Sequence, residues 1–369
     1  AVFEIRCIKG NYLLISVAME ANRISIYLTL FALCGWGLFS CGNKPTKKEE
    51  ATTFSIRYNL VGRACKSHIR GLFLVTDKVG WASGTQGTFL RMTDGENWIS
   101  DSIPGYTHLD FRDVHGFDEN NALLMAAGEE GRILRTKDGG VSWVEVYTRL
   151  DSGIFLDGMD FHENVGYCYG DPIDGKFVLV WSQDFGKHWE EVPTNSIPKS
   201  LPKEAGFAAS GTGVLTLENM SFLATGGDST ARIMRTSLRK GNSEMFNTPL
   251  RSADGCGIFS LAAAGQTVVA VGGCYLDSTS SDANCAVSDD GGETWTLITA
   301  NQPRGYRSCV AYSEKADLLL TSGRTGIEYS LDHGFNWIPV TEDGYYTCAL
   351  ADSTGWVMGK SGKMAKLSF

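Results

Sequence analysis

The stretch SDDGGETW, residues 288–295, decides the fold, because its pattern Ser/Thr-x-Asp-x-Gly-x-x-Trp returns along the chain. It reads TKDGGVSW at 136–143, SQDFGKHW at 182–189 and SLDHGFNW at 330–337, and a weaker copy, RMTDGENW, ends at Trp98. Successive tryptophans lie 45, 46, 106 and 42 residues apart. Because the long gap spans about two periods, it indicates one further unit without the pattern, which residues 232–246 fill.

A second marker counts the units independently. Each unit contains an apolar run that ends in glycine, and seven such runs occur, ending at Gly84, Gly128, Gly170, Gly226, Gly272, Gly323 and Gly359. Residues 52–369 divided among seven units give about 45 residues each, a length that suits four short strands.

The repeated pattern has the chemistry of a turn between two strands. The Asp carboxylate can accept hydrogen bonds from N–H groups of the turn, Gly permits a positive φ, and Trp offers a broad apolar surface to the next sheet. We therefore assign a structural role to the residues of the four complete copies, which are Asp138, Trp143, Asp184, Trp189, Asp290, Trp295, Asp332 and Trp337.

Seven four-stranded units that cannot bury both faces alone predict an all-β fold, a seven-bladed β-propeller in which each sheet covers its neighbours. The last unit, residues 347–369, supplies only about three strands. Residues 52–61, TTFSIRYNLV, alternate as a strand does. We expect this N-terminal strand to complete the last blade and close the ring.

Composition restricts the class of partner. The chain has 33 basic and 42 acidic residues, a net charge of -9, and a pI near 5.3. This balance provides no electrostatic surface for nucleic acid. With 43 glycines, nine tryptophans and nine prolines, the composition favours many short strands joined by tight turns.

The N-terminal segment predicts export. Residues 24–39 are nearly uncharged, Arg23 precedes them, and Cys41 follows. Sixteen residues are short for a membrane span, which needs about 20. We interpret residues 19–40 as a lipoprotein signal peptide, Cys41 as the lipidated residue, 41–51 as a polar tether and 1–18 as an upstream over-extension. An uncleaved N-terminal anchor is the alternative.

The ten cysteines include no Cys-x-x-Cys pair and no His/Cys cluster at zinc spacing, so no metal site is expected. Seven remain beyond Cys41, so at least one is unpaired within the chain. Cys274 and Cys285 flank a polar loop and are the candidate disulfide, with two free thiols as the alternative.

The repeats resemble the Asp-box (BNR) propellers, and within them the photosystem II stability/assembly factor group, through GRILRTKDGGVSW (131–143) and GTFLRMTDGENW (87–98). The similarity extends over about 52–369. Further phrases are similar to those of a lipoprotein branch in non-photosynthetic bacteria, namely IRGL (69–72), DFRD (110–113), FLDGMDF (155–161), GDPIDGKF (170–177), EAGFAASGT (204–212) and GYRSCVAY (305–312). The resemblance implies the fold and says little about activity.

A binding site is expected where the innermost strands enter the channel. Three arginines fall at that entry, and together they could bind a carboxylate or phosphate, with acidic residues that hold them or contact ligand hydroxyls. The candidates are Arg70, Arg112, Arg307, Asp113, Asp157, Asp171 and Glu204. The alternative is a closed Arg/Asp network that only ties the blades together.

Enzymatic signatures are scarce. The sequence has no dinucleotide-binding fingerprint, nucleophile elbow or Walker loop, and we expect no cofactor. Of the six histidines only His115, near Arg112, merits a test. We predict a monomeric, lipid-anchored protein of the bacterial cell envelope that binds a protein partner or small anionic ligand without catalysis and touches the membrane only through its anchor. The rival is a glycoside hydrolase, sialidase-like or other, that uses the same channel entry.

Overall fold

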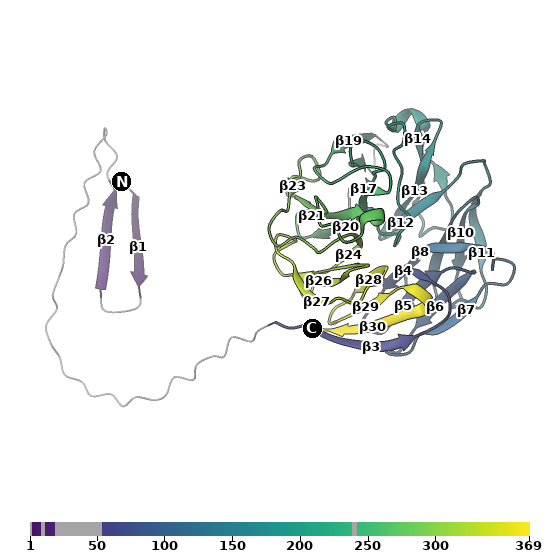
Figure 1. Ribbon diagram of the computed structural model, residues 1–369, viewed down its shortest axis with the longest axis horizontal. Helices are drawn as coiled ribbons and strands as arrows, with labels where there is room; N and C mark the ends of the chain where they lie inside the picture. Colours follow the sequence, from purple (N-terminus) through teal and green to yellow (C-terminus); the bar gives the residue numbers. More distant parts are fainter. Residues whose placement is uncertain (1, 9–11, 19–53, 238–241) are drawn as a thin grey trace. The chain divides into compact units, whose positions relative to one another are not determined.

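Seven antiparallel sheets of four strands each lie around a common centre, which confirms the predicted seven-bladed β-propeller (Figure 1). The structure is a computed structural model and describes residues 2–8, 12–18, 54–237 and 242–369. Within the unit Phe54–Phe369, the innermost strand of each blade contacts the innermost strands of the two neighbouring blades. The last innermost strand contacts the first, so the ring is closed.

The strands of each blade run from the innermost to the outermost. Blades 1 to 3 consist of β4 (Ile69–Leu74), β5 (Gly80–Gly84), β6 (Thr88–Met92) and β7 (Ile99–Ser102); β8 (Asp110–Gly116), β9 (Ala122–Ala127), β10 (Gly131–Thr136) and β11 (Val144–Arg149); and β12 (Leu156–His162), β13 (Val165–Ile173), β14 (Lys176–Ser182) and β15 (Glu190–Glu191). Blades 4 and 5 consist of β16 (Val214–Thr216), β17 (Met220–Ala224), β18 (Arg232–Ser237) and β19 (Ser243–Asn247); and β20 (Cys256–Ala264), β21 (Thr267–Cys274), β22 (Cys285–Ser288) and β23 (Thr296–Leu297). Blades 6 and 7 consist of β24 (Arg307–Ser313), β25 (Leu318–Gly323), β26 (Gly326–Ser330) and β27 (Ile338–Thr341); and β28 (Thr347–Leu350), β29 (Thr354–Met358), β30 (Lys363–Ser368) and β3 (Arg57–Arg63). Three short 3-10 helices are η1 (Thr194–Ser196), η2 (Tyr275–Asp277) and η3 (Lys360–Gly362).

The N-terminal unit, Ala1–Thr53, contains one antiparallel pair, β1 (Val2–Ile8) and β2 (Tyr12–Ala18). The predicted signal segment, the tether and Cys41 lie outside the described residues, so the lipid anchor stays a prediction. No helix in the described ranges combines the length and the hydropathy of a membrane span.

The core lies between the blades. Each of seven apolar clusters combines side chains from two neighbouring sheets, so every blade buries both of its faces. Trp81 packs with Phe111 between blades 1 and 2, and Trp98 packs with Trp356 between blades 7 and 1. This arrangement explains why the strands read as continuous apolar runs, since only the outermost strands face water.

The four Asp-Gly-Trp turns, 136–143, 182–189, 288–295 and 330–337, join the third and fourth strands of blades 2, 3, 5 and 6. In the turn of blade 5, the Asp290 carboxylate accepts hydrogen bonds from Glu293 N at 3.0 Å, Thr294 N at 2.9 Å and the Ser288 hydroxyl at 2.8 Å. The Trp295 indole N–H donates to the carbonyl of Gly292 at 3.1 Å. In this turn the Asp carboxylate thus accepts backbone N–H groups of the turn itself.

Each of these turns contacts the sheet of the preceding blade. The predicted contact of the Trp with the sheet of the following blade is therefore wrong. A Cβ on Gly292 would lie 2.8 Å from the ring of Phe222 in blade 4, and a Cβ on Gly140 would lie 2.5 Å from Phe89 in blade 1. Trp143 likewise packs edge-to-face on Phe89, with ring centroids 5.2 Å apart. The glycine is required both for its positive φ and for this close approach between blades.

Blade 4 lacks the repeated pattern, as does blade 7, whose third and fourth strands, β30 and β3, are not consecutive in the chain. Strands β18 and β19 of blade 4 occupy the region predicted for it, residues 232–246, and pair in the same antiparallel order as in the other blades. Burial between neighbouring blades therefore maintains a four-stranded sheet without an Asp-Gly-Trp turn.

The ring closes through the N-terminal strand, as predicted, although the strand lies at Arg57–Arg63 and not at 52–61. β3 pairs antiparallel with β30, and the two ends of the propeller meet there in Figure 1. Tyr58 adds a hydroxyl contact of 2.8 Å to Tyr345 and donates to Asp343 at 2.9 Å.

Candidate functional site

A segment of blade 4 crosses the centre of the ring. This crossing segment, residues 206–213, precedes the short innermost strand β16 and contacts blades on opposite sides of the ring. Its Gly206 N–H donates to Asp171 of blade 3 at 2.9 Å, and its Ser210 hydroxyl donates to the carbonyl of Ser308 in blade 6 at 2.7 Å. Thr212 binds the Ser260 hydroxyl of blade 5 at 2.6 Å. Residues 206–213 therefore lie across the end of the central channel at which the innermost strands begin.

All three predicted arginines lie on innermost strands at their entry ends, but they do not converge. Arg70 is on β4 and Arg112 on β8, and each is close enough to the other for electrostatic repulsion. Arg307 is on β24 and is fully buried with its own partners. The structure thus brings together two of the three guanidinium groups.

Arg70 has unused hydrogen-bonding capacity, as do the buried Arg135 and Arg307, whose Nε atoms also lack a partner among the described residues. The guanidinium carbon of Arg70 lies 4.8 Å from the ring centroid of Tyr346, a cation-π contact. Its Nε atom is buried and has no hydrogen-bond partner among the described residues. Burial, together with the positive charge of Arg112, lowers the pKa of Arg70 below its usual range. A negatively charged group beside Arg70 and Arg112 would relieve that repulsion.

The guanidinium of Arg112 is held by Asp110 and by the crossing segment. Its Nε donates to Asp110 at 2.5 Å, and its Nη1 donates to the carbonyl of Ala208 in the crossing segment at 2.8 Å. Its side chain keeps 26% of its surface exposed. We define the entry mouth as Arg70, Arg112, Asp110, Tyr306 and Tyr346, since Tyr306 and Tyr346 also lie within electrostatic range of Arg70.

Two of the predicted acidic residues lie beneath this mouth. Asp157 is fully buried, and neither of its carboxylate oxygens makes a well-formed hydrogen bond. Burial, followed by the charge of Asp171, raises its pKa well above the usual range, while Arg112 opposes the shift. A Cβ on Gly206 would lie 2.2 Å from Asp157, so the crossing segment covers this carboxyl. It is therefore out of reach of a sugar ring.

Two further candidates, Arg307 and Glu204, are held by partners of their own and act as braces. Arg307 lies 3.2 Å from Glu328 and donates to the carbonyl of Gly326 at 2.6 Å. Burial lowers the pKa of Arg307 to about 10. Glu204 accepts from Thr225 at 2.6 Å and from Arg232, which forms an ion pair with it. Both contacts lie within one blade, Arg307–Glu328 in blade 6 and Glu204–Arg232 in blade 4, so these residues hold single blades and do not tie neighbouring blades together.

Asp113 and His115 also have structural roles. Asp113 accepts from Val114 N at 2.7 Å and from Met159 N of blade 3 at 2.6 Å, so it joins two innermost strands. His115 is buried against the rings of Phe73 and Phe161, and burial lowers its pKa to about 3. Within the residues that the structure covers, no group of three or more His, Cys, Asp or Glu side chains is placed to hold a metal ion.

Asp171 makes the stability of this region dependent on pH. Burial raises its pKa to about 6 although it accepts the Gly206 N–H, whereas an unfolded Asp titrates at about 3.9. Because the folded chain binds the proton more tightly, this contribution to stability is complete below pH ~4 and is lost as pH rises through about 6. We expect Asp171→Asn to be more stable than the wild type by about 1–2 kcal/mol at pH 8, with no difference at pH 4. Urea unfolding at both pH values measures this, and parallel pH profiles of the two proteins would contradict it.

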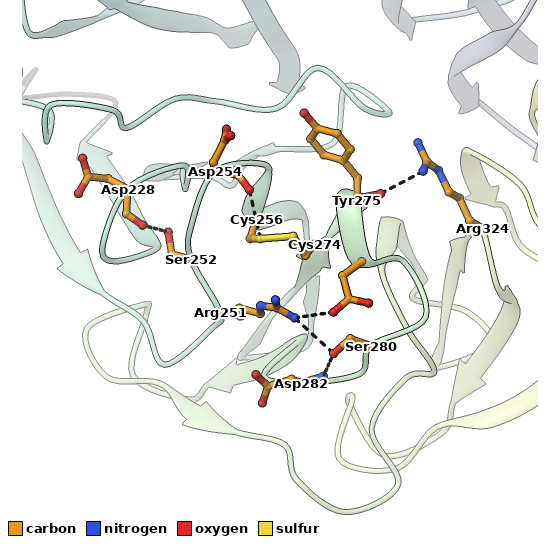
Figure 2. Close-up of a disulfide and its surroundings, with 11 residues drawn as sticks. Asp228, Arg251, Ser252, Asp254, Cys256, Cys274, Tyr275, Ser280, Asp282 and Arg324 are labelled. Atoms are coloured by element: carbon orange, nitrogen blue, oxygen red, sulfur yellow. Dashed lines mark hydrogen bonds and ion pairs between the residues drawn. A yellow bond between two sulfur atoms is a disulfide. The ribbon is translucent and has the colours of Figure 1, made fainter.

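The predicted disulfide is wrong in one partner. Cys274 is bonded to Cys256, and Cys285 is a buried free cysteine (Figure 2). Cys256 and Cys274 are directly opposite each other on paired strands β20 and β21, whereas Cys285 begins β22 and pairs with Val271. Register across a blade therefore selects the partner, and closeness in sequence does not.

The disulfide lies beside a firmly held loop on the entry side. Arg251 donates to Asp277 at 3.2 Å and to Ser280 at 3.3 Å, and Arg324 donates to the carbonyl of Tyr275 at 3.0 Å. Figure 2 shows the contacts of Arg251 with Ser280 and of Arg324 with Tyr275. Phe259 of the same blade packs on Tyr306 of the entry mouth, with ring centroids 4.7 Å apart. The loop and the mouth are thus parts of one packed surface.

Sequence reasoning missed Asp110, Tyr306, Tyr346 and the crossing role of residues 206–213. Asp110 and Tyr306 stand in the phrases DFRD and GYRSCVAY, beside arginines that were selected. Both residues stand at the start of an innermost strand, and this position could have identified them as candidates for the entry mouth. Tyr346 occupies the same position, directly before β28.

No protein-family model matches the chain, and no curated protein matches it in sequence. Solved structures with similar folds include YCF48 bound to a D1 peptide, with a TM-score of 0.61 and 14% identity over 85% of this chain and 97% of that chain. YCF48 from Cyanidioschyzon merolae has a TM-score of 0.59 and 14% identity over 84% of this chain and 98% of that chain. At this identity the likeness establishes a shared propeller architecture.

Proposed function

We propose that this chain is an envelope lipoprotein, anchored through Cys41, whose propeller binds a protein partner at the entry mouth without catalysis. The observation that carries the proposal is the Arg70–Arg112 pair, in which Arg70 has a buried N–H without a partner. Such a pair suits a carboxylate of a peptide, because charge-assisted hydrogen bonds are the strong ones.

The comparison with YCF48 supports a protein partner. One similar structure is bound to a D1 peptide, which is a peptide ligand on a propeller of the same size. The sequence resemblance to photosystem II stability/assembly factors points the same way. We infer that this chain also binds a peptide segment of another protein. The residues of its entry mouth would determine which peptide sequence binds.

The test uses fluorescent peptides with either a free or an amidated C-terminus, measured against the full chain by fluorescence anisotropy. We expect a subset of the free-carboxylate peptides to bind, and Arg70→Gln or Arg112→Gln to weaken binding at least tenfold, since a charge-assisted hydrogen bond contributes about 1.5–3 kcal/mol. Binding should also weaken with salt.

Arg149→Gln is the matched control, because Arg149 lies on the outermost strand β11 and pairs with Asp151 on the surface. It should leave binding unchanged. Equal affinity in all three variants, or no effect of amidation, would exclude the mouth as the site. The anchor is tested separately by fatty-acid labelling of the exported protein, which Cys41→Ser should abolish; persistent labelling would refute lipidation at Cys41.

A further inference from the structure

Two buried thiols meet at the boundary between blades 6 and 7. Cys309 lies on β24 and Cys348 on β28, the innermost strands of the two blades, and both side chains are almost wholly shielded from water. The Cys309 thiol donates to the backbone carbonyl of Cys348 at 3.3 Å. Both cysteines belong to the apolar cluster that joins the two blades.

Hydrogen bonds on both sides of the thiols fix the two strands relative to each other. The Ser308 hydroxyl donates to the carbonyl of Tyr346 at 2.7 Å, and the Ser313 hydroxyl donates to the carbonyl of Ala351 at 2.7 Å. These bonds hold Cys309 beside Cys348 and prevent the strands from sliding. The pair is therefore part of a defined interface and not a chance approach of mobile side chains.

The surroundings of Cys309 favour its thiolate. The hydroxyls of Thr212 and Thr347 donate to its sulfur at 3.5 and 3.8 Å, while the Cys348 thiol donates to the carbonyl of Leu320 at 3.5 Å. Burial acts to raise the pKa of Cys309, but the hydrogen bonds at its own sulfur outweigh it and lower the pKa to about 6. The thiolate is the nucleophile in disulfide exchange.

The geometry points to a second disulfide, Cys309–Cys348, which we propose forms as the protein folds in the presence of a disulfide oxidant and links blade 6 to blade 7. The Cys309 thiolate attacks a disulfide such as oxidised glutathione, and a mixed disulfide forms as one glutathione thiolate leaves. The Cys348 thiolate then attacks the Cys309 sulfur and releases the second glutathione. Two cysteine thiols lose two electrons and two protons, and the oxidant becomes two thiols.

The other free cysteines cannot compete for these partners. Cys168 is in the cluster between blades 2 and 3, Cys285 is between blades 5 and 6, and Cys65 packs against the cluster between blades 7 and 1. The known bond, Cys256–Cys274, lies within blade 5. The proposed bond is different in kind, because it would covalently join two neighbouring blades.

The experiment refolds the reduced full chain in a buffer of reduced and oxidised glutathione, blocks free thiols under denaturing conditions, and maps the peptides by mass spectrometry. We expect a Cys309–Cys348 cross-linked peptide, lighter by two hydrogen atoms than its parts, alongside Cys256–Cys274. Cys65, Cys168 and Cys285 should carry the blocking group. Refolding with a phosphine reductant should leave every cysteine blocked.

Variants separate this bond from the known one. Oxidation should raise the melting temperature of Cys168→Ser, the matched control, as much as that of the wild type, and should raise that of Cys348→Ser less, because a cross-link restricts the unfolded chain. The proposal is overturned if Cys309 and Cys348 are both blocked in protein whose Cys256–Cys274 bond has formed. It is also overturned if Cys348→Ser gains as much melting temperature on oxidation as the control. Neither outcome depends on what the entry mouth binds.

Discussion

Replacing Arg307 by methionine is expected to lower the free energy of unfolding by about 3 kcal/mol, because removal of one partner leaves the other charge buried. Arg307 has no exposed surface, and Glu328, 3.2 Å away, is only 3% exposed. Glu328 would keep the backbone N–H of Arg304, which donates to it at 2.8 Å. Glu328 would also keep its ion pair with the Arg304 guanidinium at 3.7 Å, but that side chain is 60% exposed, so its charge replaces that of Arg307 only in part. Urea denaturation followed by tryptophan fluorescence measures the loss.

The double variant Arg307→Met with Glu328→Gln should recover most of this stability, since it removes both charges together. Lys315→Met is the surface control: Lys315 and Asp352 form an ion pair at 3.0 Å, but both are more than half exposed. Its cost should remain below about 1 kcal/mol. If Arg307→Met kept full stability and instead lost peptide binding, Arg307 would be a ligand-binding residue and our assignment as a brace would be wrong.

Removal of the N-terminal strand is expected to have the largest effect. A chain that begins at residue 64 lacks β3, and with it the pairing to β30 and the packing of Ile56 and Tyr58 on the cluster between blades 6 and 7. Buried apolar side chains contribute about 1.5–3 kcal/mol each, and a backbone hydrogen bond contributes about 1 kcal/mol net. We expect a loss of more than about 5 kcal/mol relative to a chain that begins at residue 54.

The same truncation should also change the oligomeric state. Without β3 the backbone of β30 is an unpaired edge, which favours association with other chains. Size-exclusion chromatography detects this. Addition of a synthetic peptide of residues 54–63 should restore the monomer and part of the stability, whereas a scrambled peptide should not. Identical unfolding curves for the chains starting at 54 and 64 would show that β3 does not contribute to ring closure.

The architecture could be predicted because its determinants are local and repeated. A turn such as 288–295 carries its own hydrogen-bonding groups and its own glycine, so the same eight letters report the same structure wherever they occur. Ring closure could be predicted because the last unit contains only three strands. The N-terminal segment contains one strand that belongs to no other unit, so it was expected to supply the fourth strand. The cysteine pairing failed because it depends on register between strands, which spacing along the chain does not reveal.

The site was harder to predict because it depends on where side chains point. Arg70 and Arg307 occupy equivalent places at the start of innermost strands, yet one faces the mouth and the other is buried against Glu328. The difference is due to Glu328 on β26, the third strand of the blade, which binds Arg307. The sequence around Arg307 does not indicate this partner. Similarly, Glu204 was expected to hold one of the three arginines or to contact a ligand, but its partner is Arg232, 28 residues further along the chain.

The segment at residues 206–213 has a consequence for how anything can reach this protein. Because its backbone spans the hub from Arg112 of one blade to Ser308 of another, the ring is blocked and no polypeptide can thread through it. A visiting chain must come and go by the same side, and only its terminus or a tight loop can touch this segment. If the entry mouth binds a peptide as proposed, the peptide therefore enters and leaves on one face of the ring.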